Sequence, residues 1–447
     1  MRGLFERERR RGLVFTTEAH RNDELGTMND EVRTSGLLDS SFIVHRSSLS
    51  FPVPLWLVCP ACHTQPIIRN AALILTLLAF CSLPTGAAQN RSASGQDFDK
   101  LAAAAVQARD ANRIDEAVAL YRQALSSRPK WGEGWFYLAT LLYERDSFAE
   151  AASAFKQATE LNPKVGTAWV MLGLSEFKLN RYDDSLKHIQ QGRRLGITDN
   201  PNLRSVMLYH EGLLLLTKGD FETGQKMLGS LSREGFNSED HIIALGLAVL
   251  RLRPSDLPSA ESATREATAR AGLAEHFAVQ KKFDEALREY ERLAADFPKV
   301  QNVQYAYGRY LLLSRDDEKA IAAFQREIEN TPNHLLARLW IADTKLKLKD
   351  YAGGLPYAEA AVKLSPQLPL GHYLLGSLFL ETNQTTRAIT ELETAQKSLP
   401  NEPKIYFALG RAYQRADRRE DAERARATFA KLSKQMEEAT KNNRSPQ

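Results

Sequence analysis

Apolar and small side chains recur with a helical period through most of the chain, in blocks of two helices. In residues 135–145 they fall at i, i+3, i+4 and i+7, on one face of a helix: Trp135, Leu138, Ala139 and Leu142. After a polar turn the period resumes over residues 148–161, with Ala151, Phe155 and Ala158. Asn162-Pro163 ends this second helix, because proline disfavours helical geometry in the residue before it. The pattern predicts a helix–turn–helix unit.

This unit repeats with a spacing of 34 residues. Prolines close the units at positions 129 and 163, and again at 298, 332, 366 and 400. A small residue early in each unit keeps the same spacing within each group: Ala105, Ala139, Gly173, Ala274, Gly308, Ala342, Gly376 and Gly410. Clear units begin near residues 98, 132, 166, 267, 301, 335, 369 and 403. Because a lone helix pair cannot bury both of its faces, the units must stack.

The repeated residues resemble the motif of the tetratricopeptide-repeat (TPR) family, which has an aromatic residue, Leu-Gly or Leu-Ala, an Ala–aromatic–Ala set and a closing proline. The unit beginning near 132 matches through Trp135, Leu138, Ala139, Ala151, Phe155, Ala158 and Pro163. The unit beginning near 369 matches through Leu375, Gly376, Ala388, Leu392, Ala395 and Pro400. The resemblance implies an all-α fold, a right-handed superhelical solenoid of 34-residue helix–turn–helix repeats.

The register divides the repeat region into segments. We predict a first array of three units at 98–199, a second array of four units at 267–402, a terminal unit with a capping helix at 403–439, and a polar tail at 440–447. The capping helix is dense in Arg, Glu and Lys, as expected for an outer face that meets water. Residues 200–266 hold divergent repeats, in which Arg253 to Pro258 carries two prolines. This segment is either a hinge between the arrays or a decayed repeat that still packs, and we favour the second.

The N-terminal fifth has a different pattern. Residues 1–66 are predicted to be an unstructured extension, and residues 67–88 resemble a signal peptide. In that segment Arg69 precedes an apolar run over 71–83, and Gly86-Ala87-Ala88 supplies small residues for cleavage. Residues 89–97 are a predicted linker. Because a signal peptide should begin a protein, we infer that translation starts downstream of Met1. The expected location is exported, periplasmic or extracellular; the alternatives are membrane-anchored and cytoplasmic.

Composition narrows the function classes. The 447 residues include 59 Lys and Arg against 55 Asp and Glu, a net charge of +4, and 43% are hydrophobic. A nucleic-acid binder would need a stronger basic surface, and a disordered chain would have less apolar content. The length alone leaves room for about three domains, one of them catalytic. Because the repeats account for most of the chain, too few residues remain for a separate catalytic domain.

The chemistry-bearing motifs are few. Cys59-Pro60-Ala61-Cys62-His63 matches a c-type haem attachment pattern, but it lies upstream of the predicted cleavage site. We found no nucleotide, zinc-protease, hydrolase or calcium motif. Six histidines beyond residue 97 are scattered over different units, and we expect them to be exposed or to line a groove. Asp183-Asp184 and Asp316-Asp317 are expected to cap helices and to complement helix dipoles. The sequence therefore predicts a protein that is not an enzyme, with no catalytic residue, cofactor or metal.

The resemblance also implies a binding surface, because certain positions of each first helix face a concave groove in this family. In this sequence the predicted groove residues are Phe136, Tyr137, Thr140, Tyr143, Tyr305, Arg309, Trp340, Asp343, Tyr373, Ser377, Phe407, Arg411 and Arg415. Val170, Leu174, Phe177 and Leu339 occupy further groove positions. The Lys and Asn clamp of chaperone-binding relatives is missing from the first array, so a partner segment with apolar side chains fits better.

The predicted function is a non-enzymatic scaffold or adaptor that binds a protein or peptide in this groove. We expect no nucleic acid, no small-molecule substrate, and membrane contact only through an uncleaved signal segment. One alternative is an oligomerising structural component of a cell-envelope assembly. The other is a haem- or redox-linked protein that uses Cys59, Cys62 and His63.

Overall fold

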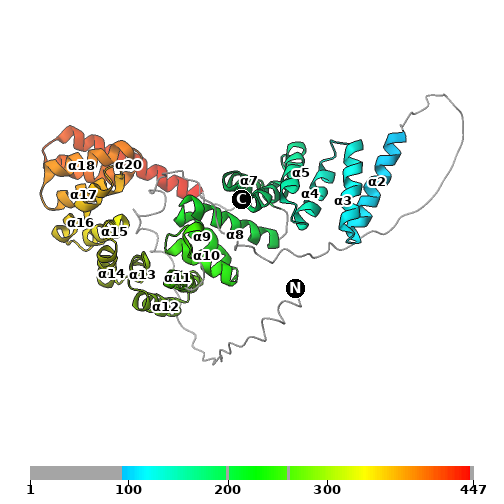
Figure 1. The fold of residues 1–447 in the computed structure, drawn as a ribbon. Coiled ribbons are helices and arrows are strands. Elements are labelled where there is room, and N and C mark those ends of the chain that lie inside the picture. Colours follow the sequence, from blue (N-terminus) through cyan, green and yellow to red (C-terminus); the bar gives the residue numbers. More distant parts are fainter. Residues whose placement is uncertain (1–92, 198–200, 259–261, 443–447) are drawn as a thin grey trace, which may run out of the picture. The chain divides into compact units, whose positions relative to one another are not determined.

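The computed structural model describes residues 93–197, 201–258 and 262–442 of the chain. Over these ranges the chain is helical and contains no strand (Figure 1). The predicted extension, the signal-like segment and the Cys59–His63 motif lie outside the described residues. Within the described ranges, no helix combines the length and the apolar content that crossing a membrane requires.

The helices follow one another in pairs along the chain. In order they are α2 (Ala93–Asp110), α3 (Ile114–Ser127), α4 (Gly132–Glu144), α5 (Phe148–Leu161), α6 (Gly166–Lys178), α7 (Tyr182–Leu195), α8 (Pro201–Lys218), α9 (Phe221–Arg233), α10 (Glu239–Val249), the short 3₁₀ helix η3 (Pro254–Asp256), α11 (Ala263–Val279), α12 (Phe283–Asp296), α13 (Val303–Leu313), α14 (Asp317–Asn330), α15 (Leu335–Lys347), α16 (Tyr351–Leu364), α17 (Pro369–Glu381), α18 (Thr385–Ser398), α19 (Pro403–Arg415) and α20 (Arg419–Asn442).

The predicted helix faces form the core of each pair. On α4, Leu138, Ala139 and Leu142 are buried, and on α5 Ala151 and Phe155 have no exposed surface. Small residues at the crossing let the two helix axes approach, and the aromatic ring fills the space beside them. The same arrangement recurs along the chain, so the predicted all-α repeat solenoid is confirmed.

The turn between the two helices of a unit has the same backbone in every unit described. Each first helix is followed within two residues by a residue with positive φ: Asn112, Asp146, Asn180, Gly219, Arg251, Lys281, Arg315, Lys349, Asn383 and Asp417. Just beyond the helix, an amide N–H donates back to a carbonyl five residues earlier, as from Ser147, three residues after the end of α4, to Leu142. This left-handed cap satisfies carbonyls that have no partner within the helix. Because Gly219 and Arg251 have positive φ as well, the same turn also occurs in the divergent segment.

The divergent segment contains a repeat that has lost its second helix. The helix α10 ends in the usual left-handed turn at Arg251, but only η3 follows, because Pro254 and Pro258 cannot lie inside a continuing helix. The next helix, α11, packs against both α10 and α12. It therefore serves as the second helix of one pair and the first helix of the next.

Hydrogen bonds to proline carbonyls join consecutive units. The indole N–H of Trp135 donates to the carbonyl of Pro129 at 2.8 Å, and Trp169 donates to Pro163 at 2.9 Å. His372 and Tyr406 make the same contact with Pro366 and Pro400, at 2.9 and 2.8 Å. The carbonyls near a helix C-terminus have no partner within the helix, so these donors stabilise the end of one unit from the start of the next.

The two terminal helices are longer than predicted. Helix α2 begins at Ala93, inside the predicted linker 89–97, and α20 continues to Asn442, inside the predicted tail 440–447. The inner units are closed by proline, but no proline occurs between residues 85 and 128 or between 404 and 445. Without that stop signal, the helices run further.

Candidate functional site

The predicted groove residues of the first array lie together on α4 and are half-buried. Phe136 contacts the edge of Phe155, with ring centroids 5.8 Å apart, and Tyr143 contacts Phe148 at 5.2 Å. The guanidinium of Arg109 lies 4.1 Å from the centre of the Tyr137 ring. These side chains thus join α4 to α2 and α5 while keeping part of each ring exposed.

Not every predicted groove position reaches the surface. Thr140 is half-buried, and its hydroxyl donates to the carbonyl of Phe136 at 2.9 Å, within the same helix. Val170, Leu174 and Leu339 are buried in the core. Because a buried side chain cannot contact a partner, these three contribute to the packing between units.

In the second array, Tyr305 and Arg309 on α13 meet Trp340 on α15. The indole N–H of Trp340 points to the hydroxyl of Tyr305 at 3.4 Å, and the guanidinium of Arg309 lies 5.9 Å from the ring of Trp340. Trp340 also stacks on Phe324, with an interplanar angle of 10°. Tyr305 is only 2% exposed, so it supports Trp340 from below, while Arg309 and Trp340 are half-buried.

Arg309 is charged in a largely buried environment. Burial opposes the charge, but Tyr305, Glu222, Glu275 and Tyr290 around it more than offset this effect, and the pKa of Arg309 is raised. Its guanidinium forms no hydrogen bond or ion pair with the described residues, so its N–H groups keep their capacity to donate. The carboxylates of α9 and α11 act on it through space.

Asp343, Tyr373 and Ser377 continue the row from α15 to α17. Asp343 is buried and forms an ion pair with Lys347, one helical turn later, at 2.7 Å. Burial raises the pKa of Tyr373 to about 12, and the negative charge of Asp343 adds to the effect. Ser377 is buried one helical turn after Tyr373. The exposed part of this segment therefore comes from Tyr373 and Lys347.

The end of the row is an arginine pair around one carboxylate. Arg411 on α19 contacts Glu381 on α17 at 2.6 Å, and Arg415 approaches the same carboxylate at 3.8 Å. Arg415 also donates to the carbonyl of Leu380. Phe407 is 53% exposed, and the guanidinium of Arg411 lies 6.0 Å from its ring. Two cations thus share a single acidic partner beside an exposed aromatic ring.

The nine residues predicted in the second array and the terminal unit form one row across the first helices α13, α15, α17 and α19. We call this surface the first-helix row: Tyr305, Arg309, Trp340, Asp343, Tyr373, Ser377, Phe407, Arg411 and Arg415. The sequence reasoning missed the charged partners Lys347 and Glu381. Their signal was present, because Lys347, Glu381 and Arg415 occupy the same position of successive 34-residue units.

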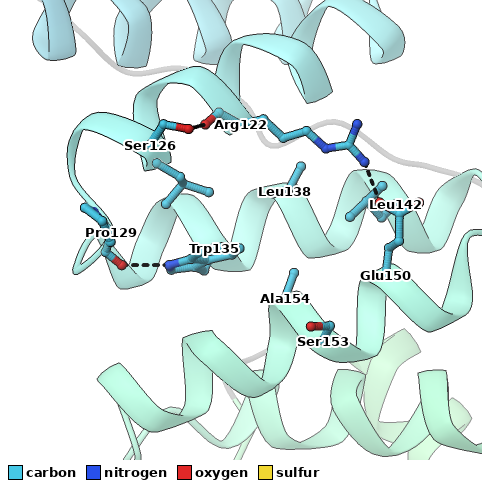
Figure 2. A pocket seen from close by; sticks show the side chains of 10 residues that line it. Arg122, Ser126, Pro129, Trp135, Leu138, Leu142, Glu150, Ser153 and Ala154 are labelled. Atoms are coloured by element: carbon cyan, nitrogen blue, oxygen red, sulfur yellow. Dashed lines mark hydrogen bonds and ion pairs between the residues drawn. The ribbon is translucent and has the colours of Figure 1, made fainter.

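An open pocket of about 550 Å³ lies elsewhere, between α3, α4 and α5. Figure 2 shows Leu138 and Leu142 at its centre and an ion pair between Arg122 and Glu150, 2.5 Å apart, across one side. The indole N–H of Trp135 donates to Pro129 at its other end. None of the predicted groove residues lines this pocket, and its apolar walls are already buried by the repeat contacts.

A smaller pocket of about 260 Å³ contains a polar network around Asn302. The Asn302 amide N–H₂ donates to the carbonyl of Leu250 at 2.8 Å, and its oxygen lies 2.8 Å from Nε2 of His334. The backbone N–H of Asn302 donates to the buried carboxylate of Glu327 at 2.9 Å. Asn302 therefore joins the end of α10 to the starts of α13 and α15.

The prediction that the histidines are exposed or line a groove is wrong for four of them. His210, His241, His276 and His334 are all buried, with 2–7% of their surface exposed. Three of these lie on α8, α10 and α11, where the repeat register is irregular and the sequence did not show which helix face is covered. Among the described residues, no group of three or more His, Cys, Asp or Glu side chains is arranged to hold a metal ion.

Of the predicted capping carboxylates, Asp316 is confirmed. It is the N-cap of α14, and its side chain accepts the N–H of Lys319 at 3.2 Å. Asp183 and Asp184 lie in the first turn of α7, which has no side-chain cap. There they complement the positive end of the helix dipole, and Asp183 pairs with Lys218.

Comparison with known proteins supports the repeat assignment. The sequence profile of the tetratricopeptide repeat matches residues 103–163, 138–200, 271–334 and 373–434, about half of the chain. Anaphase-promoting complex subunit 3 of Schizosaccharomyces pombe is 26% identical over 136 residues, which are 29% of this chain and 20% of that protein. The chain thus spans about a fifth of the length of this curated relative.

Solved structures with similar helices cover part of the chain. A MamA fragment from Desulfovibrio magneticus RS-1 is 26% identical, with a TM-score of 0.35, over 39% of this chain and 96% of the fragment. The Cut9–Hcn1 hetero-tetramer of the anaphase-promoting complex has a chain that is 12% identical, with a TM-score of 0.33, over 77% of this chain and 88% of its own. The profile matches and the repeated helix pairs together show that this chain belongs to the tetratricopeptide-repeat family.

Proposed function

We propose that this protein is a binding scaffold without catalytic activity, and that the first-helix row receives a segment of a protein partner in a groove. TPR repeats support a role in protein–protein interaction. The row adds two features typical of strong binding surfaces, half-buried aromatic rings and arginines, which dominate measured hot spots. The single observation that carries the proposal is the half-buried Arg309, whose guanidinium has no hydrogen-bond or ion-pair partner among the described residues and lies beside the half-buried ring of Trp340.

The chemistry of the row favours one kind of partner segment. The row contains the cations Arg309, Arg411 and Arg415 and the single carboxylate Asp343. With the charged partners Lys347 and Glu381 included, cations still outnumber carboxylates. A segment that places an apolar or aromatic side chain against Trp340 or Phe407, and an acidic group near Arg309, would match both the apolar and the charged parts. Electrostatic complementarity of this kind sets specificity and association rate more than raw affinity.

The test starts from peptides selected on the full-length protein from a displayed peptide library. The dissociation constant of the best peptide is then measured for wild type, Arg309→Gln and Trp340→Ala, with Arg424→Gln on the exposed face of α20 as control. We expect the two row variants to bind at least tenfold more weakly, equivalent to about 1.4 kcal/mol, and the control to bind like wild type. Equal affinity in all four proteins would show that the row is not the binding surface.

A pull-down with Tyr373→Ala combined with Arg411→Ala addresses the far half of the row. The double variant should capture less of an identified partner, while its helical circular-dichroism signal stays unchanged. Undiminished capture would limit the binding surface to α13 and α15.

We also propose that the protein is exported. The support is the sequence pattern of residues 67–88, where a basic residue, an apolar run and small residues follow one another. Mass spectrometry of the mature N-terminus tests this directly. A chain that starts near Gln89 agrees with export and removes the haem alternative, whereas a mature chain that retains Cys59 to His63 contradicts it.

A further inference from the structure

A buried polar cluster joins the consecutive helices α9, α10 and α11, where the divergent segment meets the second array. Ser232 on α9 has its hydroxyl oxygen 2.8 Å from Nε2 of His241 on α10 and 3.0 Å from Nδ1 of His276 on α11. Gln280, just after α11, places its amide nitrogen 3.0 Å from Nε2 of His276 and 3.0 Å from the carbonyl of Ser232. Ser232, His241 and His276 are 0%, 2% and 6% exposed. One hydroxyl thus ties two histidines from different helices.

Only one arrangement of protons also gives the Ser232 hydroxyl hydrogen an acceptor within this cluster. A carbonyl only accepts, so the Gln280 amide nitrogen donates to Ser232 and, with its second hydrogen, to Nε2 of His276. His276 must then carry its proton on Nδ1 and donate to the Ser232 hydroxyl. That hydroxyl in turn donates to Nε2 of His241. Both histidines are therefore neutral, and Nδ1 of His241, which carries the remaining hydrogen, has no partner.

The cluster occupies the place where the repeat is incomplete. In the other units a second helix separates consecutive first helices, but α10 is followed only by η3 and the segment up to residue 262. The helices α10 and α11 instead touch backbone to backbone, with Gly246 and Gly272 at the crossing. Few side chains can interlock at such a contact. Besides the apolar contacts of Leu228 with α10 and the hydrogen bond from Gln225 to Glu275, the hydrogen bonds through Ser232 link this crossing to α9.

Protonation of either histidine disrupts the chain of hydrogen bonds. If Nε2 of His241 gains a proton, both His241 and His276 donate to Ser232, and the Ser232 hydroxyl hydrogen loses its acceptor. A second proton on His276 would face the amide hydrogens of Gln280. Buried polar groups left in this state cost free energy that an opened, hydrated junction does not incur.

Burial, more than the surrounding charges, also opposes protonation. Burial lowers the pKa of His241 to about 4, with His276 adding to the effect, and burial together with Lys282 lowers the pKa of His276. From α9, the contacts to the cluster come from Ser232. On α11, Glu275 is held by Gln225 and by the hydroxyl of Tyr290, at 2.7 and 2.9 Å.

The remaining charged groups lie at the helix starts. Glu239 and Asp240 occupy the first turn of α10, and Arg265 on α11 acts on Asp240. None of the three forms a hydrogen bond or ion pair with the cluster. His241 is itself in the first turn of α10, where the positive end of the helix dipole also disfavours a cation.

We propose that the α9–α10–α11 junction is an acid-sensitive lock, in which neutral His241 and His276 hold the three helices together through Ser232 and protonation opens the junction while the flanking repeats stay folded. The size of the effect follows from linkage. For a group that titrates near 6.5 when open and near 4 when closed, the opening equilibrium rises about 20-fold between pH 7 and pH 5. The sign of the pH dependence follows from the lowered histidine pKa: the junction has its full stability above pH 6.5 and loses stability as the pH falls toward 4.

Hydrogen exchange of the full-length protein at pH 7 and pH 5, corrected for intrinsic rates, tests the lock. We expect protection over residues 239–249 and 266–280 to fall at least tenfold at pH 5, while residues 132–161, which contain no histidine, keep their protection. In His241→Gln the ratio of protection at the two pH values should fall toward one in the junction. His210→Gln, on neighbouring α8, is the matched control and should retain the wild-type ratio.

A second variant covers the case in which His241→Gln does not fold. Ser232→Ala removes the shared hydroxyl but keeps both histidines, so we expect a junction already less protected at pH 7. The proposal is overturned if the wild-type junction is equally protected at both pH values. It is also overturned if protection is lost together in residues 132–161, or if His241→Gln keeps the wild-type ratio.

Discussion

Single residues determine how closely neighbouring helices approach, and the divergent segment shows the extreme case. A Cβ atom on Gly246 would lie 1.8 Å from the carbonyl oxygen of Thr268, and one on Gly272 would lie 1.8 Å from that of Ile242. These contacts are with backbone atoms, which cannot rotate away as a side chain can. Only glycine therefore permits the α10–α11 crossing.

Gly246→Ala should accordingly destabilise the protein by about 3 kcal/mol, because the added methyl group forces the two helices apart. The control is Gly410→Ala on α19, where the nearest atom to a new Cβ is 3.4 Å away. There we expect a stability gain of up to about 1 kcal/mol, since alanine favours a helix over glycine. Urea unfolding of both variants measures the difference, and similar effects at the two sites would contradict the backbone contact.

His334 is another residue whose protonation state affects stability. It caps α15 by accepting the N–H of Ala337 at 3.0 Å, and burial lowers its pKa to about 4, with Arg251 and Arg338 adding to the effect. A histidine held neutral in the folded state contributes stability above pH 6.5, and this contribution is lost as the pH falls toward 4. Lowering the pH from 7 to 5 should therefore cost about 2 kcal/mol at this site.

His334→Asn provides the comparison, because asparagine also caps helices and does not titrate. We expect the variant to be less stable than wild type at pH 7, since it loses the bond to Asn302, and to lose less stability between pH 7 and pH 5. Urea unfolding at both pH values provides the readout. An unchanged pH dependence would show that His334 does not titrate in this range.

At the scale of the helix pair, the repeated small residues and the closing prolines had the greatest predictive value. The faces carrying Leu138, Ala139 and Ala151 are buried as predicted, and α5 ends just before Pro163. The break at Pro254 and Pro258 was also predicted. The double role of α11 was not, because the sequence shows where a second helix is lost but not which helix takes its place.

Ala151→Leu tests the predicted helix crossing. Ala151 has no exposed surface between α4 and α5, so a larger side chain should destabilise the protein by about 1–3 kcal/mol. Ala149→Leu, at an exposed position of the same helix, should change stability by less than about 0.5 kcal/mol. The urea midpoints of Ala151→Leu and Ala149→Leu measure the difference in stability. Equal midpoints would show that Ala151 does not lie at the helix crossing.

For the whole molecule, the contacts follow the order of the chain. The extensive helix contacts of the described residues join helices that are adjacent or one apart in sequence. In such a stack, stability is close to a sum of unit and nearest-neighbour contributions. A local change should therefore remain local, except where a longer contact such as Asn302 to Leu250 connects units.

Ala388→Leu on α18 probes this property at the far end from α2. The substitution fills a site with no exposed surface and should increase hydrogen exchange in α17, α18 and α19. Exchange in α2 to α5 should stay at the wild-type rate. An equal increase in both regions would mean that the chain unfolds as a single cooperative unit.

The sequence by itself determined the fold class, the repeat length and the positions of the first-helix row, because a helical period and a 34-residue spacing follow from local backbone geometry and from the need to bury one face of each helix. The tertiary structure alone decided which row residues are accessible. It also decided that Arg411 and Arg415 share the carboxylate of Glu381, and that His241 and His276 both lie within hydrogen-bond distance of Ser232. Those contacts join residues from different helices, and their distances depend on how closely the helices pack, which no periodicity in the sequence encodes.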